Sequence, residues 1–286
     1  MAGFDFGVST SGAQDFSQIQ TPDNAQMTHF VNDDGFNIFR LPAGWQFLLN
    51  NNLGGTLDSN NFNRYNSLVQ ACLATGSYCI LDVHNYARWN GAIVGQGGPT
   101  NAQLANIWSQ LASKYASNSK IIFGVMNEPH DVPSISTWAA TVQESVNAIR
   151  RAGATSQMIL LPGNGWTGAA TFISSGSLAA LLPITNLDGS KTGLIFDVHK
   201  YLDSDGSGTH TECVTNNIND AFAPLATALR QNGRQAMLTE TGGGNTQSCV
   251  RYMCEQIAYL NANSDVYLGY VAVGHHTIMA VVNTRC

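Results

Sequence analysis

Short apolar runs alternate with longer amphipathic segments along most of the chain. The apolar runs predict eight strands, at residues 4–8, 37–41, 78–84, 121–126, 158–161, 194–199, 236–240 and 266–271. Most of these runs are apolar along their whole length, which is typical of parallel strands buried on both faces.

Apolar residues at intervals of three and four predict helices between the runs. The clearest stretches are residues 24–34, 62–74, 104–115, 135–149, 222–229 and 250–258, and the pattern at 167–182 is weaker and partly loop-like. Strands that alternate with helices indicate an α/β fold with a parallel sheet and right-handed crossovers. A closed barrel and an open doubly wound sheet share this pattern, although no G-x-G-x-x-G follows the first strand, which disfavours a dinucleotide fold.

Functional side chains in parallel sheets gather at the carboxyl ends of the strands. Polar residues end the apolar runs here at Arg40, His84, Asn85, Asn127, Glu128, His199, Tyr201 and Glu240. Of the five glutamates in the chain, only Glu128 and Glu240 follow strand-like runs. Two carboxylates at one rim suit glycoside hydrolysis, in which one protonates the leaving oxygen and the other attacks the anomeric carbon. The alternative is that both are caps or ion-pair partners.

The neighbouring polar residues fit the same chemistry. Arg40 and the two histidines have the groups to hold a carboxylate nucleophile ionised, and Tyr201 has a hydroxyl to donate to it. Asn127 can bond a sugar hydroxyl.

Three tryptophans, Trp45, Trp89 and Trp166, each follow a strand end. An exposed indole in a cleft suits a polysaccharide because sugar rings present C–H faces to it. A tryptophan is nevertheless more often a core residue than a sugar platform, so burial is the commoner expectation for each of them.

Composition narrows the classes of partner. The net charge is −6 and no basic stripe occurs, so we expect no nucleic-acid partner. No apolar run is long enough to span a membrane.

Six cysteines without a C-x-x-C pair favour disulfides and secretion, with buried thiols in a cytosolic enzyme as the alternative. No ligand spacing of the zinc or EF-hand kind occurs, so we expect no metal and no cofactor.

Five segments together resemble glycoside hydrolase family 5, and within it the fungal endoglucanases. They are IFRLP (38–42), LDVHNYARW (81–89), GVMNEP (124–129), IFDVHKY (195–201) and LTETGG (238–243). The resemblance runs from about Gly3 to Tyr270. It implies a single domain over residues 1–286, folded as a (β/α)8 barrel. It also implies a retaining endo-β-1,4-glucanase that acts on cellulose and related β-glucans, with Glu128 as acid/base and Glu240 as nucleophile.

The resemblance assigns further residues. Arg40, His84, His199 and Tyr201 match the residues around the nucleophile, Asn127 belongs to the acid/base motif, and Trp166 is similar to a cleft tryptophan of the fungal branch. It also implies the disulfides Cys72–Cys79 and Cys213–Cys249, and leaves Cys286 as the candidate partner of Cys254. We expect a secreted monomer.

The end of the chain departs from the family. Val273 stands near the position of a family tryptophan, and the final helix is absent from the pattern. A valine offers a sugar less apolar surface than an indole, so we expect reduced activity and stability. Two alternatives remain: another β-glycanase such as a mannanase, and a glycan-binding form with impaired catalysis.

Overall fold

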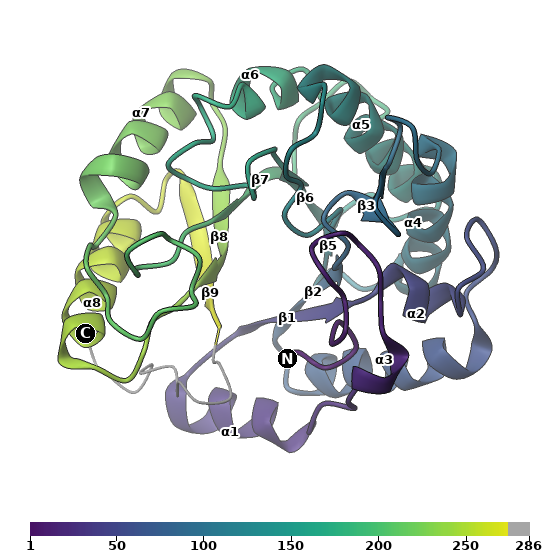
Figure 1. The fold of residues 1–286 in the computed structure, drawn as a ribbon, viewed down its shortest axis with the longest axis horizontal. Helices are drawn as coiled ribbons and strands as arrows, with labels where there is room; N and C mark the ends of the chain where they lie inside the picture. Colours follow the sequence, from purple (N-terminus) through teal and green to yellow (C-terminus); the bar gives the residue numbers. More distant parts are fainter. Residues whose placement is uncertain (274–286) are drawn as a thin grey trace.

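The computed structural model describes residues 1–273. Within these residues one parallel sheet runs in the order β1 (Ile38–Ala43), β2 (Tyr78–Val83), β5 (Ile121–Gly124), β6 (Met158–Pro162), β7 (Leu194–His199), β8 (Ala236–Thr241) and β9 (Tyr267–Ala272). The sheet curves into a ring with helices around it, and the two edge strands, β1 and β9, come into contact (Figure 1). This nearly closed barrel confirms the predicted fold class.

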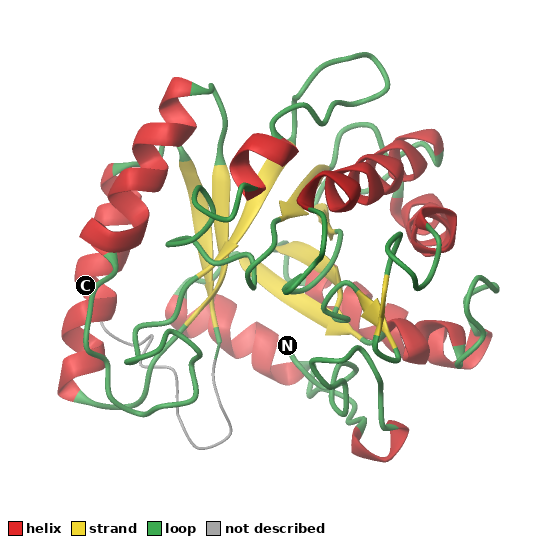
Figure 2. Ribbon diagram, turned by 45° about the horizontal axis from the view of Figure 1, so that its top comes forward, coloured by secondary structure: helices red, strands yellow, loops and turns green. Residues whose placement is uncertain are grey.

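The helices lie outside the strands, as Figure 2 shows in red around yellow. The longer ones are α1 (Ala25–Asp34), α3 (Ser59–Ala74), α4 (Asn101–Tyr115), α5 (Ile135–Arg151), α7 (Ala223–Gln231) and α8 (Gln247–Ala262). Short elements complete the described residues: η1 (Phe16–Gln18), α2 (Trp45–Leu49), the hairpin β3 (Arg88–Trp89) with β4 (Ala92–Ile93), α6 (Ser177–Leu181) and the π-helical turn η2 (Ile218–Phe222). The weak pattern at 167–182 therefore yields only one short helix. No helix within residues 1–273 is long and apolar enough to cross a membrane.

An apolar layer lies beneath the polar ends of the strands. Its residues come from five neighbouring strands: Ile80, Ile122, Leu160, Ile195 and Met237. Side chains two positions apart on a strand share a face. Asp82, Asp197 and Thr239 therefore follow members of this layer on the same face, toward the carboxyl ends. The layer fills the barrel interior below the carboxyl ends of the strands. Polar groups occupy the end of the barrel above it, at the carboxyl ends.

Tryptophans on two helices tie the helices to those same strand ends. Trp108 on α4 donates its indole N–H to the carbonyl of Val125 at 3.0 Å, and Trp138 on α5 donates to that of Pro162 at 2.9 Å. Both side chains are fully buried, as their helical spacing predicts. A buried indole N–H needs such a partner. The two hydrogen bonds therefore fix the position of α4 and of α5 along the strands and their distance from the sheet.

The predicted strand at residues 4–8 is wrong. Phe4 makes one parallel bridge to Ala43, and Val8 pairs only with Gln14 in an antiparallel bridge. The chain turns instead, because Gly7 has a φ of 81°, a left-handed conformation that ends extended structure. The segment therefore sits beside β1 without continuing the sheet.

The last predicted strand is present as β9. Val273, which follows it, donates its N–H to the carbonyl of Thr241 at 2.8 Å. The predicted absence of a final helix concerns residues outside the described part of the chain.

Two disulfides confirm the predicted pairs. Cys72 bonds Cys79 across a separation of 7 residues, and Cys213 bonds Cys249 across 36 residues. The third suggested pair includes Cys286, which lies outside the described residues.

The two disulfides should stabilise the fold unequally. A cross-link removes more entropy from the unfolded chain when it closes a longer loop, which gives about 4 kcal/mol for Cys213–Cys249 and about 2 kcal/mol for Cys72–Cys79. We expect a Cys213→Ser/Cys249→Ser variant to unfold at a lower urea concentration than a Cys72→Ser/Cys79→Ser variant. Equal or reversed unfolding midpoints would contradict this ranking.

Candidate active site

The predicted polar residues converge at the carboxyl end of the barrel. Arg40 comes from β1, His84 follows β2, Glu128 follows β5, and His199 and Glu240 come from β7 and β8. Asn85 is the exception among the strand-end residues. It is fully buried and accepts from the backbone N–H of Trp45 at 2.6 Å, so it is structural.

Glu240 is a buried carboxylate with a donor on each oxygen. Arg40 donates from Nη1 to Oε1, and the Tyr201 hydroxyl donates to Oε2 at 2.8 Å. Burial by itself raises the pKa of Glu240, but the positive charges of His199, Arg40 and His84 and the Tyr201 hydrogen bond outweigh burial and lower it to about 2. Glu240 is therefore ionised at any ordinary working pH.

The ring of Tyr201 is held by a loop beyond β7. A side chain on Gly208 would come within 2.6 Å of that ring, so the loop packs against it only because residue 208 is glycine. Asp203 organises the same loop by accepting from the backbone N–H groups of Gly208 and His210, each at 3.1 Å.

Glu128 faces Glu240 across the site. His199 lies between them, with Nδ1 2.8 Å from Oε1 of Glu128 and 3.6 Å from Oε2 of Glu240. Oxygens of the two glutamates lie within 4.8 Å of each other. Glu128 adopts a left-handed backbone with a φ of 39°, which is uncommon for a residue with a side chain.

Asn127 completes the contacts of Arg40. Its Oδ1 accepts from Nη2 of Arg40 at 2.7 Å. Its Nδ2 is buried and has no hydrogen-bond partner within residues 1–273. A buried amide donor without a partner is costly, so this N–H suits a ligand hydroxyl.

The sequence interpretation missed two buried aspartates behind the histidines. Asp82 accepts from Nη2 of Arg40 at 2.9 Å and lies 2.8 Å from Nδ1 of His84. Asp197 accepts from Thr239, which in turn contacts His199. A signal was present, because the triplet D-V-H occurs at 82–84 and again at 197–199. Alternation along a strand places each Asp on the same face as its His.

Trp166 is an exposed aromatic beside the site. Its side chain is 41% exposed, and one face of the indole stacks on His130 with ring centres 3.9 Å apart. Tyr86 meets it edge-on at 6.0 Å. Trp45 and Trp89 are buried and pack against each other, so for these two the expectation of burial in the core holds and neither offers a platform to a sugar.

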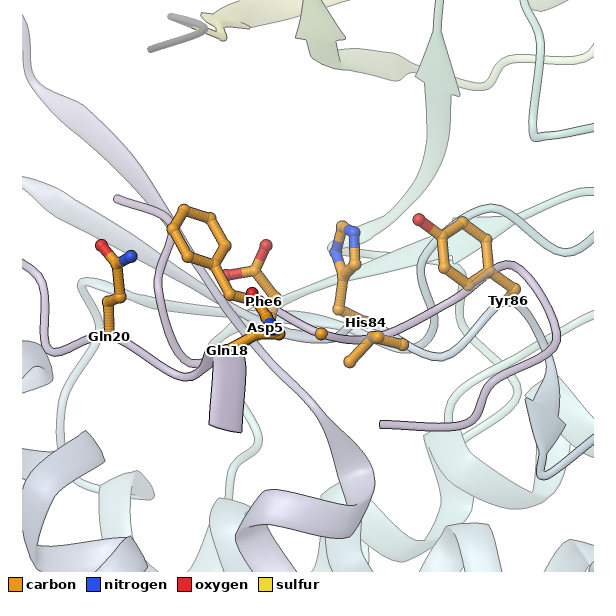
Figure 3. A pocket seen from close by; sticks show the side chains of 8 residues that line it. Asp5, Phe6, Gln18, Gln20, His84 and Tyr86 are labelled. Carbon is orange, nitrogen blue, oxygen red and sulfur yellow. The ribbon is translucent and has the colours of Figure 1, made fainter. Parts of the chain in front are cut away.

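A hollow of about 310 Å³ borders the site on the side of His84 and Tyr86 (Figure 3). Asp5, Gln18 and Gln20 supply its polar lining. In Figure 3 the side chains of Asp5, His84 and Tyr86 project to the same side. Neither Glu128 nor Glu240 lines this hollow, so it borders the pair of glutamates and does not contain it.

Two groups of side chains within residues 1–273 have the composition of a metal site: Glu128, His199 and Glu240, and Asp203, Asp205 and His210. The first group already exchanges hydrogen bonds and ion pairs among its members and with Arg40 and Tyr201. In the second, both oxygens of Asp203 accept from its own loop. Because these side chains already have partners in the protein, we assign a metal to neither group.

A family model identifies the chain. The model described as cellulase (glycosyl hydrolase family 5) matches residues 2–275. The chain belongs to glycosyl hydrolase family 5.

Relatives of this cellulase family support the assignment. Endoglucanase EG-II from Hypocrea jecorina is 66% identical over 96% of this chain and 68% of its own length. The manganese dependent endoglucanase Eg5A of Phanerodontia chrysosporium is 49% identical over 94% of this chain and 69% of its own length. The crystal structure of Cel5A (EG2) from Hypocrea jecorina (Trichoderma reesei) matches with a TM-score of 0.95 and 64% identity, over 97% of this chain and 89% of that one.

Loss of the Tyr201 hydroxyl should change the pH profile. The Tyr201 hydrogen bond lowers the pKa of Glu240, so Tyr201→Phe should raise it and move the acid limb of kcat/KM to higher pH. We also expect kcat/KM to fall about 10- to 100-fold, as for loss of a hydrogen bond to a charged group. Tyr115→Phe is the matched control, because the Tyr115 hydroxyl bonds Asn66 away from the site. An unchanged acid limb in Tyr201→Phe would refute the role of this hydroxyl.

The expectation of no metal is testable directly. We expect activity after dialysis against EDTA to equal that of the untreated protein, because the two candidate groups are satisfied by protein partners. Activity that disappears with EDTA and returns only with Mn²⁺ would show dependence of the kind named for the Phanerodontia chrysosporium relative.

Proposed function

We propose that this chain is a retaining endo-β-1,4-glucanase, with Glu240 as the nucleophile and Glu128 as the acid/base. The single observation that carries the proposal is the pair of glutamates, whose oxygens lie within 4.8 Å of each other. Retaining enzymes keep their carboxyl groups about 5–5.5 Å apart, whereas inverting enzymes separate them by about 6.5–9.5 Å to admit a water.

The surroundings of the two glutamates support different roles. Arg40 and Tyr201 donate to Glu240 and keep it ionised, as a nucleophile must be. Glu128 has one oxygen, Oε1, on His199, which leaves Oε2 to carry a proton to the leaving group. Two carboxyl groups in such different environments can divide acid and nucleophile between them.

The reaction then proceeds by double displacement. A carboxylate oxygen of Glu240 forms a bond to the anomeric carbon as the glycosidic C–O bond breaks, and the leaving oxygen takes its electron pair and the proton of Glu128. Water next attacks the same carbon, gives a proton to Glu128, and releases Glu240 as carboxylate. The free Nδ2–H of Asn127 is available to a sugar hydroxyl during both steps.

The substrate class follows from the lining of the site and from the relatives. Trp166 offers one exposed apolar face, and Asp5, Gln18 and Gln20 offer groups for hydroxyls. Relatives that cover most of this chain are endoglucanases. We therefore propose internal β-1,4-glucosidic bonds of cellulose and related β-glucans as the target. Faster hydrolysis of mannan than of carboxymethylcellulose would favour the mannanase alternative instead.

We also propose that the enzyme acts outside the cell. The two disulfides support this location, because such bonds form and persist in oxidising compartments. The monomeric state remains a prediction from the sequence.

Substitution of each glutamate should separate their roles. Glu240→Gln should reduce turnover about 10⁴-fold on every substrate, because a neutral amide replaces the attacking carboxylate. Glu128→Gln should reduce hydrolysis of cellulose oligomers about 10²- to 10⁴-fold, but should leave glycosylation by dinitrophenyl cellobioside nearly intact, since that leaving group needs no proton. The control is Glu144→Gln, on the exposed face of α5. If dinitrophenyl cellobioside restored the glycosylation step equally in both glutamate variants, or in neither of them, the assignment of roles would be contradicted.

A further inference from the structure

Thr239 connects two buried side chains behind the acid/base. Its hydroxyl donates to Oδ1 of Asp197 and lies 2.9 Å from Nε2 of His199. All three side chains are at most 3% exposed. Since the single hydroxyl hydrogen goes to Asp197, the oxygen of Thr239 must accept from His199, and Nε2 of His199 therefore carries a hydrogen.

A β-bulge makes this contact available. The pairing of β7 with β8 shifts between Val198 and His199, so that His199 lies opposite Glu240 although Val198 lies opposite Leu238. One extra residue, Thr239, is thus inserted beside His199. Successive side chains on a regular strand point to opposite faces, but at a bulge two residues face one partner. His199 can then meet Thr239 and Glu240 together.

The other ring nitrogen of His199 faces only acceptors. Nδ1 lies 2.8 Å from Oε1 of Glu128 and 3.6 Å from Oε2 of the ionised Glu240. With a hydrogen already on Nε2, a neutral ring would present a lone pair to Glu128. The proton of Glu128 would then point at His199 and away from the substrate. A doubly protonated ring instead donates to Oε1 and leaves the proton of Glu128 on Oε2.

We propose that Asp197 and Thr239 are positioning residues for the acid/base: they hold His199 doubly protonated, and so keep the proton of Glu128 on the oxygen that faces the leaving group. This inference rests on the proposed function. Asp197 acts through charge and Thr239 through its acceptor oxygen, and neither touches the substrate.

The charges around His199 agree with this assignment. Burial lowers the pKa of His199, but Glu240, Glu128 and Asp197 outweigh it and raise the pKa to about 9. The more distant charged and titratable groups of the same site are Arg40 and Tyr201, which bind Glu240, and the pair of Asp82 and His84 on the side of β2. Both ring nitrogens of His199 therefore have a partner: Thr239 for Nε2 and Glu128 for Nδ1.

The test compares pH profiles for two leaving groups. Thr239→Val removes the acceptor of the Nε2–H bond, which destabilises the charged ring, lowers the pKa of His199, and lets the ring lose a proton at lower pH. For phenyl β-cellobioside, whose leaving group needs a proton, the alkaline limb of kcat/KM should move down by about one pH unit. For 2,4-dinitrophenyl β-cellobioside, the limb and the rate should match wild type.

Three further variants separate positioning from damage. Thr239→Ser keeps the hydroxyl and should restore the wild-type limb. Asp197→Asn keeps the shape but removes the charge, and should move the limb in the same direction as Thr239→Val. Thr141→Val is the matched control, since Thr141 is a buried threonine on α5 that bonds Asn101. An unchanged limb in Thr239→Val, or equal losses on both substrates, would overturn the proposal.

A measurement on the wild-type protein guards against variants that do not fold. In ¹⁵N spectra of histidine-labelled protein at neutral pH, both ring nitrogens of His199 should be protonated, with the signal identified by its absence in His199→Gln. A neutral His199 ring would overturn the proposal whatever the variants do. The roles of the glutamates are tested separately, because failure of dinitrophenyl cellobioside to rescue Glu128→Gln would reject the proposed function itself.

Discussion

The site depends on one buried interaction, the negative charge of Glu240 held between Arg40 and His199. An unpaired carboxylate at such a depth would take up a proton or destabilise the fold. Two positive groups close to it make ionisation favourable despite burial. The same arrangement keeps Glu240, the proposed nucleophile, ionised without a general base.

That interaction requires further charges behind it. Arg40 also binds Asp82, and His199 is linked through Thr239 to Asp197, so each of the two cations has an aspartate partner besides Glu240. Acidic and basic side chains therefore alternate at the carboxyl end of the barrel. They lie above the apolar layer of Ile80, Ile122, Leu160, Ile195 and Met237. Removal of one partner from such a network costs more than the pair contributes, because the other charge stays buried. This coupling gives the catalytic geometry little freedom to change.

Much of this could be predicted from the sequence because the barrel has a simple periodicity. Seven of the eight predicted strands are present, and the polar residues at the ends of five of them are Arg40, His84, Glu128, His199 and Glu240. The first run failed, since the glycine at position 7 turns a segment that hydrophobicity alone makes strand-like. Position after a strand did not separate the buried Trp45 from the exposed Trp166, because an indole there can cap the core or face the cleft.

The buried support was harder to predict. Asp82 and Asp197 lie within apolar runs, where a single polar residue reads as an interruption, although the repeated D-V-H triplet placed each beside its histidine. Thr239 reaches His199 only because of a bulge, and pairing register between strands distant in sequence is not written in local pattern. Chain order thus gave the residues of the site, while the three-dimensional register gave their partners.

The central claim is that Glu240 attacks the substrate, and covalent trapping tests it most directly. A 2-deoxy-2-fluoro cellobioside with a dinitrophenyl leaving group slows both steps but leaves the first one faster, so the glycosyl-enzyme should accumulate. Mass spectrometry of the digested protein should then show one added 2-deoxy-2-fluorocellobiosyl group on the peptide that contains Glu240. A label on Glu128, or inactivation of the enzyme without any covalent sugar, would contradict the account.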